Sequence, residues 1–129
     1  MDQRKMVLLA DASEEFRTLL REEIEKTGEF SVEVARDGNE VLKKTEERDL
    51  DLLVMDAMLA GMDGISVLRQ LQKREDMPMT ILTSGFVSDR MLMEASELGA
   101  AYFLPKPFET ENLLDKMRGL FLQAPKESL

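Results

Sequence analysis

Four polar side chains that could do chemistry each stand at the end of a short apolar run of the sequence. Asp11 directly follows the first run, Asp56 and Thr83 end two later ones, and Lys106 follows the last, between two prolines. If these runs are parallel strands of one sheet, their carboxyl ends meet along one edge, where such sheets bind ligands. The spacing therefore predicts that two carboxylates, a hydroxyl and an ammonium share one site.

The chemistry that these groups favour is transfer of a phosphoryl group to a carboxylate. Two close carboxylates, such as Asp11 and Asp56, repel each other, and a divalent cation relieves that repulsion. Because the sequence has no His and no Cys, the ligands are oxygen atoms, which favour Mg²⁺ over zinc. A carboxylate can attack a phosphoryl group while the metal ion and Lys106 share the charge on its oxygens. Thr83 can donate a hydrogen bond to one of those oxygens.

The elements that must position these groups alternate along the chain. Continuous apolar runs predict buried strands, and the alternating Phe30, Val32 and Val34 predict a half-buried strand near an edge. Apolar residues at helical spacing predict a helix after each strand. The predicted strands span 6–10, 30–34, 52–55, 79–83 and 102–104, and the predicted helices span 13–26, 39–47, 64–73, 88–98 and 111–122. This alternation predicts an α/β fold with a doubly wound, five-stranded parallel sheet covered on both faces.

Length and composition bound the class of protein. No linker or repeat divides the 129 residues, so we expect one domain over 1–129 with its core at about 5–122. The net charge of −9 repels nucleic-acid phosphates and disfavours direct DNA binding. The apolar runs are too short to cross a membrane, and the first residues do not match a signal peptide. Together with the lack of cysteine, these features favour the cytoplasm.

Six short motifs resemble, in their order and spacing, the receiver domains of two-component response regulators. Each motif alone is weak, but the set is highly specific and covers about residues 5–122. The motifs are Leu-Leu-Ala-Asp at 8–11, Leu-Leu-Val-Met-Asp at 52–56, Met-Asp-Gly at 62–64, Ile-Leu-Thr-Ser at 81–84, Gly-Ala-Ala-Tyr-Phe at 99–103 and Lys-Pro-Phe at 106–108. The first motif and the stretch 101–108 further resemble the receiver of the sporulation master regulator of endospore-forming bacteria. The resemblance implies the flavodoxin-like receiver fold.

The resemblance also implies a role for each site residue. Asp56 is the phosphoacceptor, Asp11 belongs to the acidic pair near Mg²⁺, and Lys106 contacts the phosphoryl group. Thr83 is the switch hydroxyl, and Phe103 is the aromatic switch residue that turns inward when the hydroxyl moves. Family members receive phosphate from a phosphohistidine on a histidine kinase or phosphotransfer protein. The implied function is a signalling switch, and not an ordinary enzyme, that acts on partners or a second copy through its fourth helix, fifth strand and fifth helix.

The sequence departs from the family pattern beside the first acidic residue. Ala12 stands where the family carries a second acid, which is the more direct metal ligand. Its absence predicts weaker Mg²⁺ binding, with Asp11, Asp56 and the backbone carbonyl of Met58 as the remaining ligands.

Two further departures follow the third predicted strand. Leu59 and Ala60 replace the Met-Pro pair common in the family, which predicts a more mobile loop. The resemblance implies that Met58 and Gly85 flank the phosphoryl site. Neither has a polar side chain that could orient an attacking water. We therefore expect a phosphoaspartate at this site to be long-lived.

Alternative interpretations remain open from the sequence alone. Because of Ala12, the chain could be a degenerate receiver that docks or dimerises without phosphorylation, and Mg²⁺ affinity would separate the two hypotheses. A flavin-binding electron carrier is disfavoured, because the acidic loop at 11–15 lacks a glycine-rich phosphate cradle. Asp11 could also be a plain helix cap, and Phe103 a plain core residue. The sequence leaves open the cognate kinase, the output, the oligomeric state and whether a DNA-binding domain follows.

Overall fold

A parallel five-stranded sheet forms the centre of the protein in the computed structural model, which describes residues 3–123. The strands are β1 (Lys5–Ala10), β2 (Phe30–Ala35), β3 (Leu52–Asp56), β4 (Met79–Ser84) and β5 (Tyr102–Pro105), in the order β2-β1-β3-β4-β5. The helices are α1 (Glu14–Glu25), α2 (Gly38–Glu47), α3 (Gly64–Gln72), α4 (Asp89–Glu97) and α5 (Thr110–Gln123). The predicted α/β fold is confirmed, and no predicted element end differs by more than one residue.

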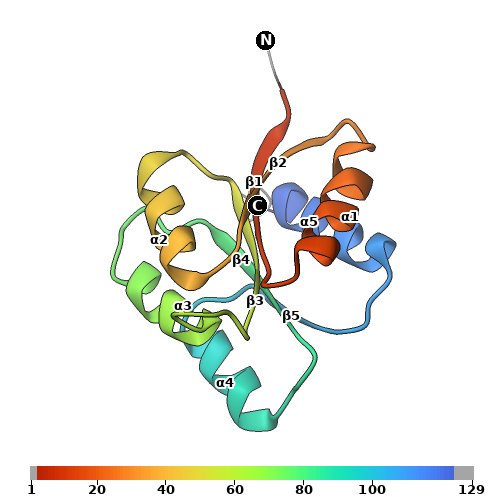
Figure 1. Ribbon diagram of the computed structural model, residues 1–129. Coiled ribbons are helices and arrows are strands. Elements are labelled where there is room, and N and C mark those ends of the chain that lie inside the picture. Colours follow the sequence, from red (N-terminus) through yellow and green to blue (C-terminus); the bar gives the residue numbers. More distant parts are fainter. Residues whose placement is uncertain (1–2, 124–129) are drawn as a thin grey trace.

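Helices cover both faces of the sheet, α1 and α5 on one side and α2, α3 and α4 on the other (Figure 1). Neighbouring side chains of a strand point to opposite faces, so each central strand contributes side chains to two cores. Leu52 and Val54 of β3 join the core under α1 and α5, while Leu53 and Met55 join the core under the other helices. Burial on both faces explains the continuous apolar runs of β1, β3 and β4. The strand β2 lies at an edge, as its alternating pattern predicts.

Short polar side chains begin the helices that follow the site strands. The hydroxyl of Ser13 accepts a hydrogen bond from the backbone N–H of Phe16 at 3.1 Å and so caps α1. Asp63 caps α3 in the same way through the N–H of Ser66 at 2.9 Å. These caps start α1 and α3 close to Asp11 and Asp56, so the first turns of both helices border the carboxyl edge of the sheet.

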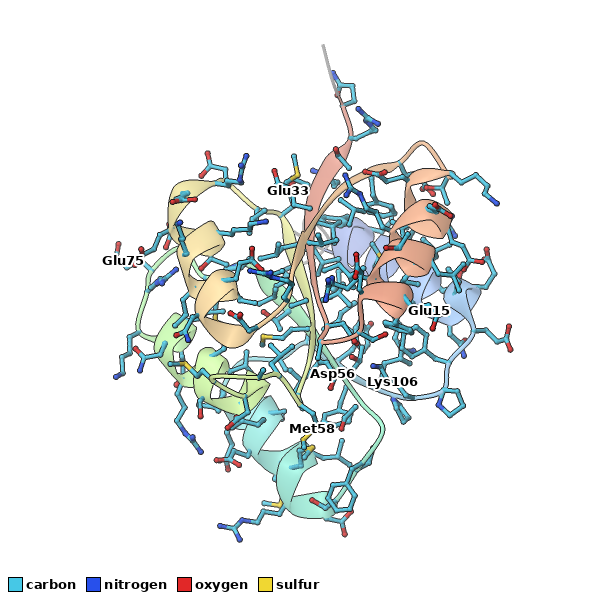
Figure 2. The ribbon with its side chains drawn as sticks, in the orientation of Figure 1. Glu15, Glu33, Asp56, Met58, Glu75 and Lys106 are labelled. Carbon is cyan, nitrogen blue, oxygen red and sulfur yellow. The ribbon has the colours of Figure 1, made fainter. Side chains whose placement is uncertain are left out.

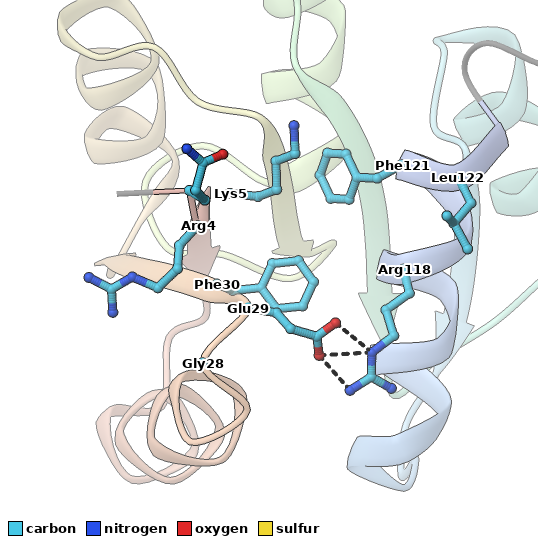
Figure 3. Close-up of a pocket in the computed structure, with 9 residues that line it drawn as sticks. Arg4, Lys5, Gly28, Glu29, Phe30, Arg118, Phe121 and Leu122 are labelled. Carbon is cyan, nitrogen blue, oxygen red and sulfur yellow. Dashed lines mark hydrogen bonds and ion pairs between the residues drawn. The ribbon is translucent and has the colours of Figure 1, made fainter. Parts of the chain in front are cut away.

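A second polar feature lies at the opposite, amino edge of the sheet. Arg118 of α5 donates hydrogen bonds to both carboxylate oxygens of Glu29, the shortest of them 2.7 Å long (Figure 3). The hydrogen bond from Arg118 is the main reason why the pKa of Glu29 lies below its usual value. The pair borders a cavity of about 420 Å³ with Phe30 and Phe121 in its wall. This contact ties the start of β2 to the last turns of α5, far from the predicted site.

None of the helices within residues 3–123 combines the length and the apolar character that crossing a bilayer requires.

Candidate functional site

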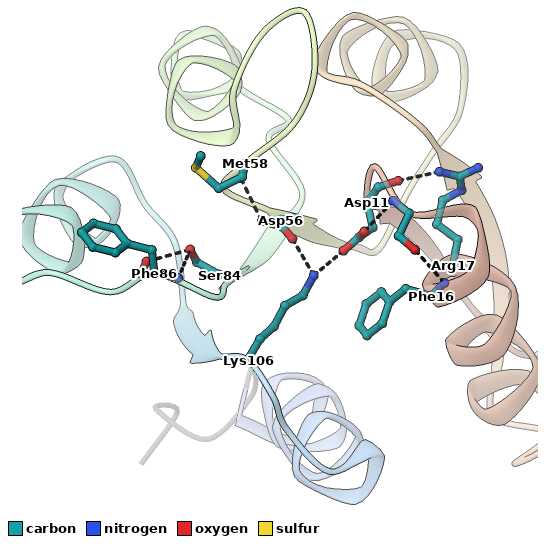
Figure 4. A network of polar contacts seen from close by, with 9 residues as sticks. Asp11, Phe16, Arg17, Asp56, Met58, Ser84, Phe86 and Lys106 are labelled. Carbon is teal, nitrogen blue, oxygen red and sulfur yellow. Dashed lines mark hydrogen bonds and ion pairs between the residues drawn. The ribbon is translucent and has the colours of Figure 1, made fainter.

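The predicted site residues meet at the carboxyl edge of the sheet. Asp11 directly follows β1, Asp56 is the last residue of β3, and Lys106 directly follows β5. Figure 2 shows Asp56, Met58 and Lys106 together at this end of the molecule, and Figure 4 shows their contacts. The sheet order places β1 and β3 side by side with β4 and β5 beyond them. The fold therefore brings together the two carboxylates and the ammonium that the sequence predicted.

Lys106 bridges the two carboxylates. Its Nζ donates hydrogen bonds to Asp11 Oδ2 at 2.7 Å and to Asp56 Oδ2 at 2.6 Å. Asp11 is 3 % exposed and Asp56 is 7 % exposed, so water screens their mutual repulsion poorly. The ammonium balances one of the two negative charges. The cluster keeps one net negative charge. It therefore attracts a cation, or an electrophile that carries partial positive charge.

The ammonium stays protonated in this setting. Burial by itself lowers the pKa of Lys106, but hydrogen bonds and charge attraction from Asp11 and Asp56 outweigh burial and raise that pKa above its usual value. Lys106 is therefore a fixed positive charge and not a general base.

Backbone N–H groups hold the second oxygen of each carboxylate. The N–H of Ser13 donates to Asp11 Oδ1 at 2.9 Å, and the N–H of Met58 donates to Asp56 Oδ1 at 2.8 Å. Both donors lie two residues after the acceptor, so the loops that leave β1 and β3 orient the carboxylates directly. Arg17, which is 8 % exposed, donates from Nη1 to the backbone carbonyl of Asp11 at 2.6 Å and fixes the same loop.

Lys106 is itself held from three directions. Its backbone N–H donates to the carbonyl of Ser84 at 2.8 Å, which continues the β4–β5 pairing past the end of the strand. The Lys106–Pro107 peptide bond is cis. The Nζ atom lies 4.3 Å from the centre of the Phe16 ring. Sequence reasoning does not single out Phe16, which has the pattern of an apolar helix residue, and its place in the first turn after Asp11 is the available clue.

Of the two predicted switch residues, Thr83 lies on the strand next to Asp56 and Phe103 on the strand beyond it. Thr83 is the register partner of Asp56 on β4 and is 3 % exposed. The backbone carbonyl of Thr83 accepts a hydrogen bond from Ala57 N–H at 2.8 Å, which ties the two strand ends together. Phe103 lies on β5 next to Leu82, partly buried against the core under α2, α3 and α4. Thr83 thus borders the carboxylate cluster, and Phe103 lies one strand further out.

The oxygen donors at this edge fit a hard divalent cation such as Mg²⁺. Asp11 and Asp56 provide carboxylate oxygens and the peptide group of Met58 lies beside them, while Ala12 adds no ligand and is exposed. Within residues 3–123, no three acidic side chains gather in a way that could hold a metal ion. Two carboxylates and a carbonyl leave about half of the octahedral positions around Mg²⁺ to water, as is usual for this ion. With only two charged ligands, the site is expected to bind Mg²⁺ weakly.

Comparisons with known proteins agree on one family. The family model for the response regulator receiver domain matches residues 7–118. Response regulator MprA of Mycobacterium avium is 37 % identical over 123 residues, which cover 94 % of this chain and 53 % of that protein. MprA of Mycobacterium tuberculosis has the same identity, with 94 % and 52 % covered. This chain thus spans about half the length of the curated relatives it matches.

Solved structures give the same result for the fold. The receiver domain of Francisella response regulator 1452 is 28 % identical, with a TM-score of 0.87 over 93 % of this chain and 98 % of that chain. A CheY-like response regulator receiver domain protein from Methanospirillum hungatei is 25 % identical, with a TM-score of 0.89 over 96 % and 98 %. None of these matches supports the degenerate alternative. None tests the narrower resemblance to the sporulation regulator, which stays a prediction.

Proposed function

Since this chain belongs to the response regulator receiver domain family, we propose that Asp56 is the residue that accepts its phosphoryl group. Receiver domains are signalling modules of two-component systems, and the proposed donor is a phosphohistidine on a histidine kinase or phosphotransfer protein. Such a donor is made from ATP, so the proposed location is the cytoplasm. The observation that carries the proposal is the bridge from Lys106 to Asp11 and Asp56, with both contacts under 2.8 Å.

The transfer follows from the places of these side chains. One oxygen of Asp56 attacks the phosphorus atom while the phosphorus–nitrogen bond to the donor histidine breaks, and the electron pair stays on the imidazole. Lys106 already contacts Asp56, so a small shift places its ammonium on a phosphoryl oxygen as negative charge moves there. Asp11 holds the other side of that ammonium and keeps it over the strand end. Met58 N–H keeps the carboxylate of Asp56 oriented toward the edge of the sheet.

Asp11, Asp56 and the backbone carbonyl of Met58 would hold Mg²⁺. The ion would neutralise charge on the phosphoryl oxygens and relieve the repulsion between the two carboxylates. The missing acid at Ala12 makes the proposed affinity low, so phosphorylation is expected to need a higher Mg²⁺ concentration than a site with three carboxylates.

The proposed output runs through Thr83 and Phe103 to the face formed by α4, β5 and α5. Phosphorylation would draw the Thr83 hydroxyl toward Asp56 and let Phe103 turn inward, which biases two existing conformations. Exposed apolar side chains near this face support a docking role. They are Phe86, Val87, Leu92 and Met93, exposed by 65, 40, 37 and 63 %. A partner protein or a second copy of this chain is the proposed occupant, and direct nucleic-acid binding is not expected at this net charge.

Intact-mass measurement after incubation with acetyl phosphate tests the proposal. Wild type should gain one phosphoryl group in a Mg²⁺-dependent way, and Asp56→Ala should gain none. Asp115→Asn is a matched control, because this carboxylate lies exposed on α5 and should leave the gain unchanged. Wild type that stays unmodified at every Mg²⁺ concentration would overturn the proposal and favour a module that only docks.

A further inference from the structure

We propose that Phe16 is a positioning residue that holds the ammonium of Lys106 over Asp56 through the face of its ring. The inference rests on the proposed function of Asp56 and adds a residue outside the charged cluster. The Nζ atom of Lys106 lies 4.3 Å from the centre of the Phe16 ring. That distance is well within the range of about 6 Å in which the negative face of an aromatic ring attracts a cation.

The ring supplies a support that the carboxylates cannot. Two of the three N–H groups of Lys106 are used by Asp11 and Asp56. When Asp56 takes up a phosphoryl group, one of its carboxylate oxygens becomes the bridging oxygen of an acyl phosphate, so one of these two partners changes during the reaction. The Phe16 ring carries no titratable or reacting atom. It therefore remains a partner for the ammonium both before and after the transfer.

Phe16 is fixed by contacts on both its backbone and its ring. Its N–H donates to the capping hydroxyl of Ser13 at 3.1 Å. Its ring meets that of Phe108 edge to face, with centres 6.0 Å apart and planes at 82°, which is a favoured geometry for aromatic pairs. Phe108 lies two residues after Lys106 in the same loop. The two rings therefore join the first turn of α1 to the loop that carries the ammonium.

The contacts close into a circuit around the site. Asp11 Oδ1 accepts from the N–H of Ser13, and Ser13 Oγ accepts from the N–H of Phe16. The Phe16 ring faces Lys106 Nζ, which donates back to Asp11 Oδ2. Each member is thus placed by two others. A change at the ring is expected to reach Asp56 through Lys106, although Phe16 touches no reacting atom.

A purely structural role makes a different prediction. Phe16 is partly buried and packs against the core under α1 and α5, so truncating it would lower stability whatever the ring does for Lys106. Volume and packing hardly change when ring hydrogens are replaced by fluorine, but the negative charge on the ring face falls. If Phe16 positions Lys106, the phosphorylation rate should depend on the electron density of the ring. If Phe16 only packs against the core, the rate should not depend on it.

Mono-, di- and trifluorinated phenylalanine placed at position 16 alone provide the test. With acetyl phosphate as donor, the rate of Asp56 phosphorylation should fall stepwise, by about three- to tenfold across the series. Phe121 is the matched control, because Lys5 Nζ lies 5.2 Å from its ring centre at the opposite edge of the sheet. The same series at Phe121 should leave the rate unchanged. A flat series at Phe16, or an equal fall at both positions, would overturn the inference.

A second pair of variants and a readout without phosphorylation complete the test. Phe16→Tyr keeps an electron-rich ring and should stay near the wild-type rate, whereas Phe16→Leu should lose at least as much as the trifluorinated ring. In the unmodified protein, the Lys106 side-chain protons should show an upfield NMR ring-current shift that is lost in Phe16→Leu and kept in Phe121→Leu. If that shift is present but wild type takes no phosphate, the proposed function fails and the ring contact stands. Absence of the shift in wild type removes the ring contact itself.

Discussion

Gly64 lies directly against Asp56, so close that the backbone of Asp56 leaves no room for a side chain at position 64. A Cβ atom built at Gly64 would lie 2.7 Å from the backbone carbonyl oxygen of Asp56 and 2.8 Å from the Cα of Ala57. The N–H of Gly64 also donates to the carbonyl of Ala57 at 2.9 Å. The start of α3 is therefore clamped onto the end of β3, and this contact sets where the carboxylate of Asp56 lies.

Gly64→Ala is expected to push the end of β3 away from α3. Because both contacts are backbone atoms, the clash is relieved only by a backbone shift, at a cost of about 1–3 kcal/mol in unfolding free energy. Urea unfolding measures that cost, and the phosphorylation rate at Asp56 should fall as well. Gly119→Ala on α5 is the control, since nothing lies within 4 Å of its added Cβ. Equal stability of the two variants would contradict the clamp.

Lys106→Met should slow phosphorylation strongly. The variant keeps the length of the side chain but removes the charge that meets the phosphoryl oxygens, and loss of one such preorganised donor costs roughly 10²-fold or more in rate. Intact-mass time courses with acetyl phosphate measure the change. Lys73→Met serves as the control, because this Lys lies exposed at the end of α3. A Lys106→Met variant within a factor of about two of wild type would remove Lys106 from the proposed mechanism.

Ala12→Asp should tighten Mg²⁺ binding. A third carboxylate next to Asp11 adds one charged oxygen ligand, which we expect to lower the dissociation constant by about tenfold. Calorimetric titration with Mg²⁺ measures this change. Ala60→Asp, which places the same charge on the exposed loop after β3, separates a ligand effect from a general rise in negative charge. Equal gains in both variants would argue against a ligand role at position 12.

The bridge at Lys106 should stabilise the protein up to alkaline pH. The pKa of Lys106 is raised above 10.5 in the folded state, so the folded protein binds this proton more tightly than the unfolded chain does. That stabilisation is complete below pH 10.5 and is lost as the pH rises through the raised pKa. The difference in unfolding free energy between wild type and Lys106→Met should therefore shrink above pH 10.5. A constant difference across that range would contradict the assignment.

The phosphoaspartate should decay slowly. Hydrolysis needs a water molecule held for attack, and Met58, which is 63 % exposed beside Asp56, has no polar side-chain group to hold one. Met58→Glu should shorten the lifetime, whereas Met93→Glu should not, because Met93 is equally exposed but lies on α4. Mass spectra taken after removal of the donor follow the decay. A half-life of seconds for the phosphoaspartate of wild type would contradict this prediction.

The strands and the charged cluster could be predicted because each follows from a simple regularity. Strands buried on both faces appear in the sequence as unbroken apolar runs, and the carboxyl ends of parallel strands meet at one edge. Asp11, Asp56 and Lys106 therefore followed from their positions after those runs, before any contact was known.

Phe16 and Arg17 could not be found in this way, for a physical reason. An apolar residue on a helix face has the same pattern whether it fills a core or lies beneath an ammonium, and only the docking of the β5–α5 loop distinguishes them. Arg17 has the sequence pattern of a solvated charge. In the structure it is buried, and its guanidinium donates a hydrogen bond to the carbonyl of Asp11. Both roles depend on contacts between segments far apart in the sequence, which periodicity does not record.

The Asp11–Lys106 contact joins residues 95 positions apart in the chain. During synthesis the carboxylates of Asp11 and Asp56 leave the ribosome well before the ammonium that neutralises them, by roughly 5–20 s for the first of them. If Asp56 is the phosphoacceptor as proposed, a nascent chain that lacks β5 carries this carboxylate without the ammonium of Lys106. We therefore expect an incomplete chain to accept no phosphoryl group until β5 has joined the sheet.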